Sequence, residues 1–227
     1  TKALKNIIEF YSGIEVSARS FSILSETNLQ VGMDHFSQIT NTMSVGLILE
    51  KEILDNRREI HGEDLLYIVS LKAKVGRLEG DRDVFFKLEA SLNRERYQNG
   101  DEMVINITSS RECYVYVFNI LSDGTVNALL PNQYLKENII KKGGSLRVPP
   151  EVGRITKFRV GLPEGETYAM EMILVLGIKA EGDINIRNFD LQMGNYRMAI
   201  TELMKFIMGF PRDQVEQVNL PYVIESS

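Results

Sequence analysis

The segment of residues 112–132 constrains the fold of this chain more than any other. It reads ECYVYVFNILSDGTVNALLPN, two apolar runs joined at Asp123 and Gly124. Side chains of a strand alternate between its two faces, and both sets are apolar or aromatic in the first run. Such a strand is covered on each side, so the sequence predicts a central strand. The Asp-Gly step predicts the tight turn that follows it.

Residues 84–179 as a whole favour an all-β domain. Short apolar runs recur between turn signals such as Asn99-Gly100, and helical periodicity is lacking. Residues 166–180, ETYAMEMILVLGIKA, form a second candidate for a central strand. The pattern predicts an Ig-like antiparallel β-sandwich. We expect the Asp101 side chain to hold the turn at Gly100 through main-chain hydrogen bonds.

The flanking regions carry helical signals. A stripe of apolar residues predicts a helix over 196–209, ended by Gly209 and Pro211, and a last strand over 216–225. Before the sandwich, the spacing of apolar residues predicts elements in this order: a helix over 4–11, a strand-like segment over 14–27, a helix over 28–43, a strand over 45–54, a polar turn over 57–64 and a strand over 65–76. The last two strands are expected to pair antiparallel.

Together these signals predict an α+β protein of two domains. The first is a small α+β module over 1–80, and residues 77–83 form a charged joint. The second, over 84–227, is the Ig-like antiparallel β-sandwich with an appended C-terminal helix.

Composition excludes several classes of function. The 26 Lys and Arg residues against 31 Asp and Glu residues give a net charge of −5, which argues against nucleic-acid binding. One cysteine cannot form an internal disulfide, and no apolar window is long enough for a membrane helix. The chain lacks an initiating Met and begins inside a helical pattern, so we expect an export signal to be missing from its start.

Candidates for catalysis and metal binding are few. Cys113 with His35 or His61 is the obvious nucleophile pair, but Cys113 opens an apolar strand, where a thiol is usually a small buried hydrophobe. The histidines and the cysteine lack zinc-ligand spacing, and no phosphate-binding motif occurs. We therefore expect no catalytic residue, no metal and no cofactor.

A set of motifs in the central region resembles a known bacterial family. The motifs are Asn93-Arg94, Tyr97, Gly100-Asp101, Tyr114 to Phe118, Asp123-Gly124 and Leu129 to Asn132. They resemble the domain of unknown function 4384, with Leu130 in place of the usual Phe. The resemblance extends over about residues 84–225 and implies neither an enzymatic activity nor a catalytic residue.

The first 80 residues are more weakly similar to the N-terminal domain of flagellar assembly protein T and its lipoprotein relatives. SETN, SVGLILEKEI and YIVSLKAKV carry this likeness. It implies export and a location in the cell envelope, in the periplasm or at the outer membrane.

These observations predict a non-enzymatic envelope scaffold that acts through protein–protein contacts. The predicted binding loop lies within 132–144, and its candidate residues are Asn132, Tyr134, Ile139, Ile140, Lys141 and Lys142. The alternative for this loop is a plain crossover anchored by its two isoleucines. Alternatives for the protein are a module that binds peptidoglycan or another envelope glycan, a component of an envelope assembly or secretion complex, and an unrecognised hydrolase.

Overall fold

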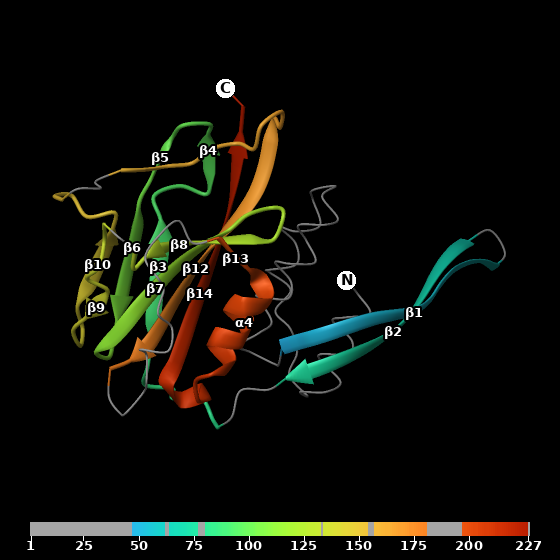
Figure 1. Ribbon diagram of the computed structural model, residues 1–227, viewed down its shortest axis with the longest axis horizontal. Helices are drawn as coiled ribbons and strands as arrows, with labels where there is room; N and C mark the ends of the chain where they lie inside the picture. Colours follow the sequence, from blue (N-terminus) through green and yellow to red (C-terminus); the bar gives the residue numbers. More distant parts are fainter. Residues whose placement is uncertain are drawn as a thin grey trace. The chain divides into compact units, whose positions relative to one another are not determined.

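Strands dominate the structure, a computed structural model that describes residues 47–61, 64–76, 80–132, 134–153, 157–180 and 197–226. These ranges contain fourteen strands, one α-helix and one short 3-10 helix. The predicted α+β class is therefore wrong, because the described part of the chain is mostly β (Figure 1). The chain divides into two compact units, Thr1–Leu78 and Glu79–Ser227.

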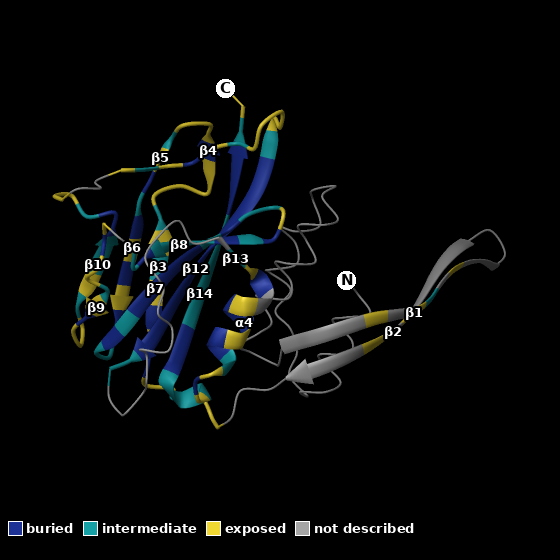
Figure 2. Cartoon of the chain, viewed as in Figure 1, coloured by how far each residue is buried: buried dark blue, intermediate teal, exposed yellow. Residues whose placement is uncertain are grey.

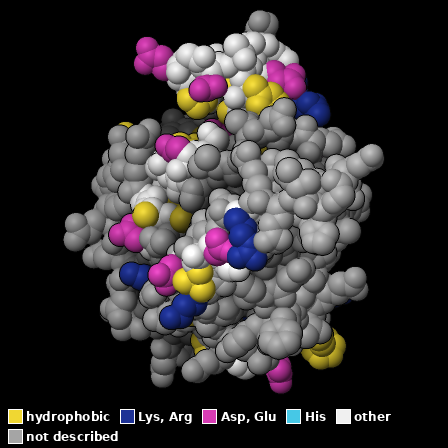
Figure 3. All heavy atoms as spheres, turned by 90° about the vertical axis from the view of Figure 1, so that its right-hand side faces the viewer, with side chains coloured by type: hydrophobic (Ala, Val, Ile, Leu, Met, Phe, Trp, Pro, Cys, Tyr) yellow, Lys and Arg dark blue, Asp and Glu magenta, His cyan; other side chains and the backbone are white. Residues whose placement is uncertain are grey.

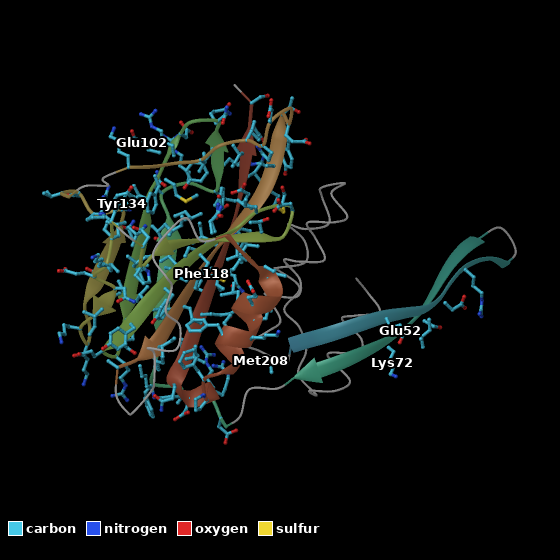
Figure 4. The ribbon with its side chains drawn as sticks, viewed as in Figure 1. Glu52, Lys72, Glu102, Phe118, Tyr134 and Met208 are labelled. Carbon is cyan, nitrogen blue, oxygen red and sulfur yellow. The ribbon has the colours of Figure 1, made fainter. Side chains whose placement is uncertain are left out.

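The described part of the first unit is a long antiparallel hairpin. Strands β1 (Leu47–His61) and β2 (Asp64–Gly76) pair in a register that places Glu52 opposite Lys72 (Figure 4). The predicted pairing of two long strands is confirmed. The polar turn predicted over 57–64 is shorter, because residues up to His61 continue β1. The predicted elements over 4–43 lie outside the described residues.

The second unit consists of two main sheets. A seven-stranded sheet has the order β13-β8-β7-β12-β14-β4, with β9 also paired to β7, and a three-stranded sheet has the order β10-β6-β3. Strands β5 and β11 form a small separate pair. The strands are β3 (Leu88–Leu92), β4 (Arg96–Gln98), β5 (Glu102–Met103), β6 (Ile105–Ser109), β7 (Cys113–Ile120), β8 (Thr125–Leu130), β9 (Ile139–Ile140), β10 (Ser145–Val148), β11 (Phe158–Arg159), β12 (Tyr168–Lys179), β13 (Arg197–Ala199) and β14 (Val215–Glu225).

One hydrophobic core joins the two sheets in a sandwich-like arrangement. Ile105 and Ile107 of β6 belong to the same buried cluster as Val115 of β7 and Ile173 of β12. Both β7 and β12 lie in the interior of the larger sheet, and Figure 2 shows them buried over most of their length. The prediction of two central strands, drawn from their apolar residues on both faces, is confirmed.

Helix α4 (Ile200–Met208) covers the other face of the larger sheet. The ring of Phe206 packs edge-on against Tyr116 of β7 with centroids 5.5 Å apart. Leu203 and Ile207 are fully buried, whereas Glu202 and Lys205 are exposed, so the helix is amphipathic. A sheet that is apolar on both faces must be covered on both, and the helix provides the cover on this second face.

The predicted helix over 196–209 is correct in its core and wrong at its start. Residues Arg197–Ala199 form β13, which pairs with β8 instead of continuing the helix. The Glu202 carboxylate accepts a hydrogen bond from the main-chain amide of Ala199, 3.2 Å away, and so closes the first turn. A final 3-10 turn (Arg212–Gln214) leads into β14, the predicted last strand.

Two predicted turns are confirmed by their backbone geometry. Gly100 has φ of +90° and Gly124 has φ of +82°, which residues with a side chain rarely adopt. The Asp101 carboxylate accepts hydrogen bonds from the main-chain amide of Gln98, at 2.9 Å, and from Arg94, at 2.8 Å. Asp101 thus holds its turn, as the sequence predicts.

Candidate binding groove

An open pocket of about 400 Å³ lies on the surface of the second unit. We call it the groove and define it by residues 130, 134–137, 146–148, 150, 152 and 153. Its floor is apolar, because Leu130, Leu135 and Val148 are buried members of the sandwich core. Its rim carries two exposed apolar side chains, Tyr134 (49% exposed) and Val152 (87% exposed).

One wall of the groove is the loop that follows β8, and Asn132 shapes it. The Asn132 side-chain oxygen accepts hydrogen bonds from the main-chain amides of Tyr134, at 2.8 Å, and Leu135, at 2.9 Å. Its side-chain amide donates to the carbonyl of Leu129, 2.7 Å away. These bonds form a local turn in which Tyr134 is exposed on the rim (Figure 4), whereas Leu135 is buried and belongs to the floor.

The other wall is β10 and the segment that follows it. Strand β10 pairs with β6 in the register Leu146 to Ile107 and Val148 to Ile105. The Arg147 guanidinium donates a 2.6 Å hydrogen bond to the carbonyl of Pro149. This bond fixes the chain where it leaves the strand, three residues before the exposed Val152.

Charges around the groove are unbalanced toward basic residues. Residues 134–153 contain four Lys or Arg and two Glu, although the whole chain has a net charge of −5. Lys141 pairs with Glu112 at 2.9 Å, and Arg147 lies 3.8 Å from Glu151. Figure 3 shows a different pattern on the face it turns to the viewer, where described basic and acidic side chains lie next to each other.

The structure brings few of the predicted loop residues together in the groove. Tyr134 lines it, and Asn132 shapes its wall without lining it. Ile140 is buried in the sandwich core as part of β9, and Ile139 is exposed but lies outside the groove. Lys141 is bound to Glu112, and Lys142 is exposed. One isoleucine therefore anchors the segment, where the crossover alternative required two.

The sequence analysis missed most of the groove. Leu146, Arg147, Val148 and Val152 follow the predicted loop by several residues and meet it only through the packing of β10 on β6. The available signal was the pair Pro149-Pro150 directly after the short stretch Ser-Leu-Arg-Val, in which polar and apolar residues alternate, because proline in or beside a strand is typical of a sheet edge.

Cys113 is fully buried in the sandwich core. Its thiol donates to the Ser109 hydroxyl, 3.3 Å away, and burial raises the pKa of the thiol. A raised pKa disfavours the thiolate that a nucleophile requires. His35 lies outside the described residues, and His61 ends β1 in the other unit.

A buried carboxyl group forms the main polar cluster inside the sandwich. Glu171 of β12 accepts hydrogen bonds from the Tyr222 hydroxyl of β14 and from the Asn119 side-chain amide of β7, the latter at 2.8 Å. Burial raises the pKa of the Glu171 carboxyl, and the two hydrogen bonds oppose that rise. The cluster joins three neighbouring strands and does not line the groove.

A second cluster of charged side chains attaches residues 82–85 to the larger sheet. The buried Glu216 carboxylate accepts two hydrogen bonds from Arg82, at 2.6 and 2.9 Å, and lies 3.6 Å from Arg212. Next to it, Lys179 pairs with Asp83 at 2.7 Å. That bond and one from the main-chain amide of Phe85 lower the pKa of Asp83. These contacts attach residues 82–85 to β12 and β14.

Comparison with known families gave a match that includes the groove and its surroundings. The matching family is described as Domain of unknown function (DUF4384). Residues 96–173 match DUF4384. The DUF4384 segment runs from β4 into β12 and contains both walls of the groove. This confirms the central part of the predicted resemblance, whereas the likeness of the first 80 residues to flagellar assembly protein T is not supported.

Two further comparisons gave no significant match, one with curated proteins and one with solved structures. Within the described ranges, no α-helix is long and apolar enough to cross a membrane. In the same ranges, no three His, Cys, Asp or Glu side chains are grouped as metal ligands would be.

Proposed function

We propose that this chain is a non-enzymatic scaffold protein that binds a protein partner in the groove. The observation that carries the proposal is the apolar floor of Leu130, Leu135 and Val148 beneath the exposed Tyr134 and Val152. Apolar surface of this kind gains free energy when a partner removes it from water. A sandwich-like frame holds both walls in place, which limits the ordering cost of binding.

The position of the chemically reactive side chains supports binding over catalysis. Cys113 and Glu171 are buried in the core, away from the groove. In the groove itself, the charged side chains of Lys136 and Glu137 are exposed to solvent, where they act as surface charges. Recognition by surfaces mounted on a rigid frame is the usual role of such loops.

We also propose that the protein acts in the bacterial cell envelope, as a periplasmic or lipoprotein component of an assembly. The basis is the three short motifs SETN, SVGLILEKEI and YIVSLKAKV alone, because the family match begins only at residue 96. Cell fractionation with an antibody against the second unit tests this location, and recovery of the protein in the cytosol would contradict it.

Site-specific photocrosslinking tests the binding function. A benzophenone amino acid is placed at Val152 in cells that naturally produce the protein, and at Val84 as the matched control. Both valines are exposed, and only Val152 lines the groove. We expect a discrete protein adduct from position 152 that is absent from position 84 and is lost when Tyr134→Ser is added. Identical adducts from both positions, or none, would reject the proposal.

Binding of an envelope glycan is the second candidate function, favoured by one observation. The half-exposed ring of Tyr134 beside an apolar floor is the type of platform on which a sugar ring stacks. Sedimentation with purified cell-wall sacculi separates the two candidates. Retention that Tyr134→Ser abolishes favours the glycan, and no retention leaves the protein partner.

A further inference from the structure

The groove runs along the edge of β10. Successive side chains of a strand point to opposite faces, so a pocket on one face is lined by alternate residues. The groove is lined by three consecutive residues of β10, Leu146, Arg147 and Val148. The wall it contacts is therefore the edge of the strand, including its main chain.

That edge is open within the described part of the chain. Among the residues that the structure describes, β10 is the terminal strand of its sheet and pairs only with β6. The main-chain amide of Ser109 donates to the carbonyl of Gly144, which fixes the alternation of the antiparallel ladder. The main-chain groups of Leu146 and Val148 accordingly face β6, and those of Ser145 and Arg147 face away from it. An open edge of this kind is a template for another strand.

The charge of the surroundings selects the occupant. The segment 134–153 has four basic and two acidic side chains in an acidic protein, and Glu112, outside the segment, pairs with Lys141. Lys136 and Lys142 are exposed, and Arg147 is half-buried on the groove wall. An extended segment with acidic residues would approach these cations favourably, and a basic one would be repelled.

We propose that the groove takes an extended acidic peptide segment of a protein partner as an added strand beside β10. The inference rests on the proposed function and specifies its partner. Alternate apolar side chains of the peptide lie on the floor formed by Leu130, Leu135 and Val148, and its main chain pairs with Ser145 and Arg147. Since β10 has four residues, the paired stretch is about 13 Å long.

Selection from a random library of nine-residue peptides displayed on phage, with the full chain immobilised, tests this proposal. The selected peptides are then synthesised and their affinities measured by fluorescence anisotropy. We expect enrichment of sequences that alternate apolar and acidic residues. Val152→Asp should weaken their binding about tenfold or more, because the rim loses apolar contact and gains a repelling charge. Val84→Asp, at a valine that is also exposed but lies outside the groove, should leave binding unchanged.

Two further measurements address the added strand itself. N-methylation of the peptide at alternate residues removes main-chain donors, and in one of the two registers it should weaken binding about tenfold. In the same complex, the main-chain amide of Arg147 should become protected from hydrogen exchange. Circular dichroism confirms that each variant remains folded.

The outcomes separate the two proposals. Peptides that depend on the groove but are basic, or are insensitive to N-methylation in both registers, overturn the acidic added strand and leave the binding function standing. Peptides that bind equally well to Val152→Asp, or a library without enrichment, overturn both. Self-association of the chain that Val152→Asp abolishes would identify a second copy as the occupant and overturn the peptide partner.

Discussion

At the scale of single residues, side chains that bond to the main chain shape the functional surface. Asn132 makes three such bonds within one turn and positions Tyr134 and Leu135 on opposite sides of the loop. Asn93 has a similar role in the motif region. Its side-chain oxygen accepts hydrogen bonds from the Tyr97 hydroxyl, at 2.7 Å, and from the main-chain amide of Val104, at 2.9 Å. Motif residues that carry the family resemblance thus serve the architecture.

Replacing Asn132 tests its role in the groove. Asn132→Ala removes the bonds to Leu129, Tyr134 and Leu135, and we expect a loss of about 1–2 kcal/mol in the free energy of unfolding. Hydrogen exchange of residues 134–137 should accelerate. Asn106→Ala on the exposed face of β6 is the control, and it should change neither quantity appreciably. Equal effects of the two substitutions would contradict the assigned role.

The buried carboxyl of Glu171 predicts a pH dependence of stability. Because burial raises its pKa in the folded state, the proton is bound more tightly there than in the unfolded chain, where the pKa is near 4.5. Proton binding at Glu171 therefore contributes fully to the stability of the folded wild type below pH 4.5. This contribution to the free energy of unfolding is lost as the pH rises through the folded-state pKa. A glutamine oxygen can accept the same two hydrogen bonds without a charge to bury.

We therefore expect Glu171→Gln to be more stable than the wild type at pH 8, with a difference that shrinks toward pH 4.5. Urea unfolding at a series of pH values measures it. Carboxylates with lowered pKa values, such as Asp83, affect both proteins alike and cancel in the difference. A constant difference at all pH values would contradict the raised pKa of Glu171.

At the scale of elements, α4 is an amphipathic cover for the larger sheet, and its apolar face should dominate its contribution. Leu203 is fully buried against that sheet, so Leu203→Ala should cost about 2–5 kcal/mol in the free energy of unfolding. Lys205→Ala on the exposed face of the same helix is the matched control and should stay within about 0.5 kcal/mol. The urea midpoints of the two variants measure both effects, provided that the dependence of the free energy of unfolding on urea concentration stays constant. A small effect of Leu203→Ala would show that the sheet does not need this cover.

The buried Glu216 should matter more than its exposed partner. Glu216→Gln leaves Arg212, 14% exposed, without its carboxylate, so we expect a loss of about 1–3 kcal/mol in the free energy of unfolding. Arg82→Ala should cost less, about 1 kcal/mol or below, because that side chain is 58% exposed. Both variants should accelerate hydrogen exchange of residues 82–85. The reverse order of the two losses would contradict this arrangement.

Local patterns in the sequence predicted some elements and not others. The two-sided apolar pattern of β7 and β12 and the stripe of α4 are visible in a window of ten residues. Strands β9 and β10 each have four residues or fewer, and β13 falls inside the predicted helix because Tyr196 and Ile200 continue the apolar stripe of that helix in the sequence. The groove depends on which sheet each short strand joins, and that choice is made by non-local packing.

At the scale of the whole chain, the second unit has its own hydrophobic core. Every member of the main buried cluster, from Phe86 to Ile224, belongs to Glu79–Ser227. The groove, α4 and both polar clusters lie in this unit as well. Folding of the unit thus draws on its own residues.

We expect residues 79–227 produced alone to fold cooperatively. In the full chain, the urea concentration at which trypsin begins to cut within residues 79–227 marks the unfolding of this unit. The urea midpoint of the isolated fragment should match that concentration. The control is a fragment of residues 88–227, which lacks the Arg82 and Asp83 contacts and the buried Phe86, and should unfold at a lower urea concentration. An unfolded 79–227 fragment would show that the unit depends on the rest of the chain.

Strand β14 lies between β12 and β4, and it is the last strand of the unit to be synthesised. Its partner β4 is made more than a hundred residues earlier and pairs with it in parallel. A ribosome translating this chain therefore carries an unfinished sheet, with the aromatic ring of Tyr97 lacking its neighbour Tyr222, until residue 225 has cleared the exit tunnel. The sheet of the second unit is therefore completed only by its last strand, and a chain stalled before β14 leaves the edges of β12 and β4 unpaired at that position.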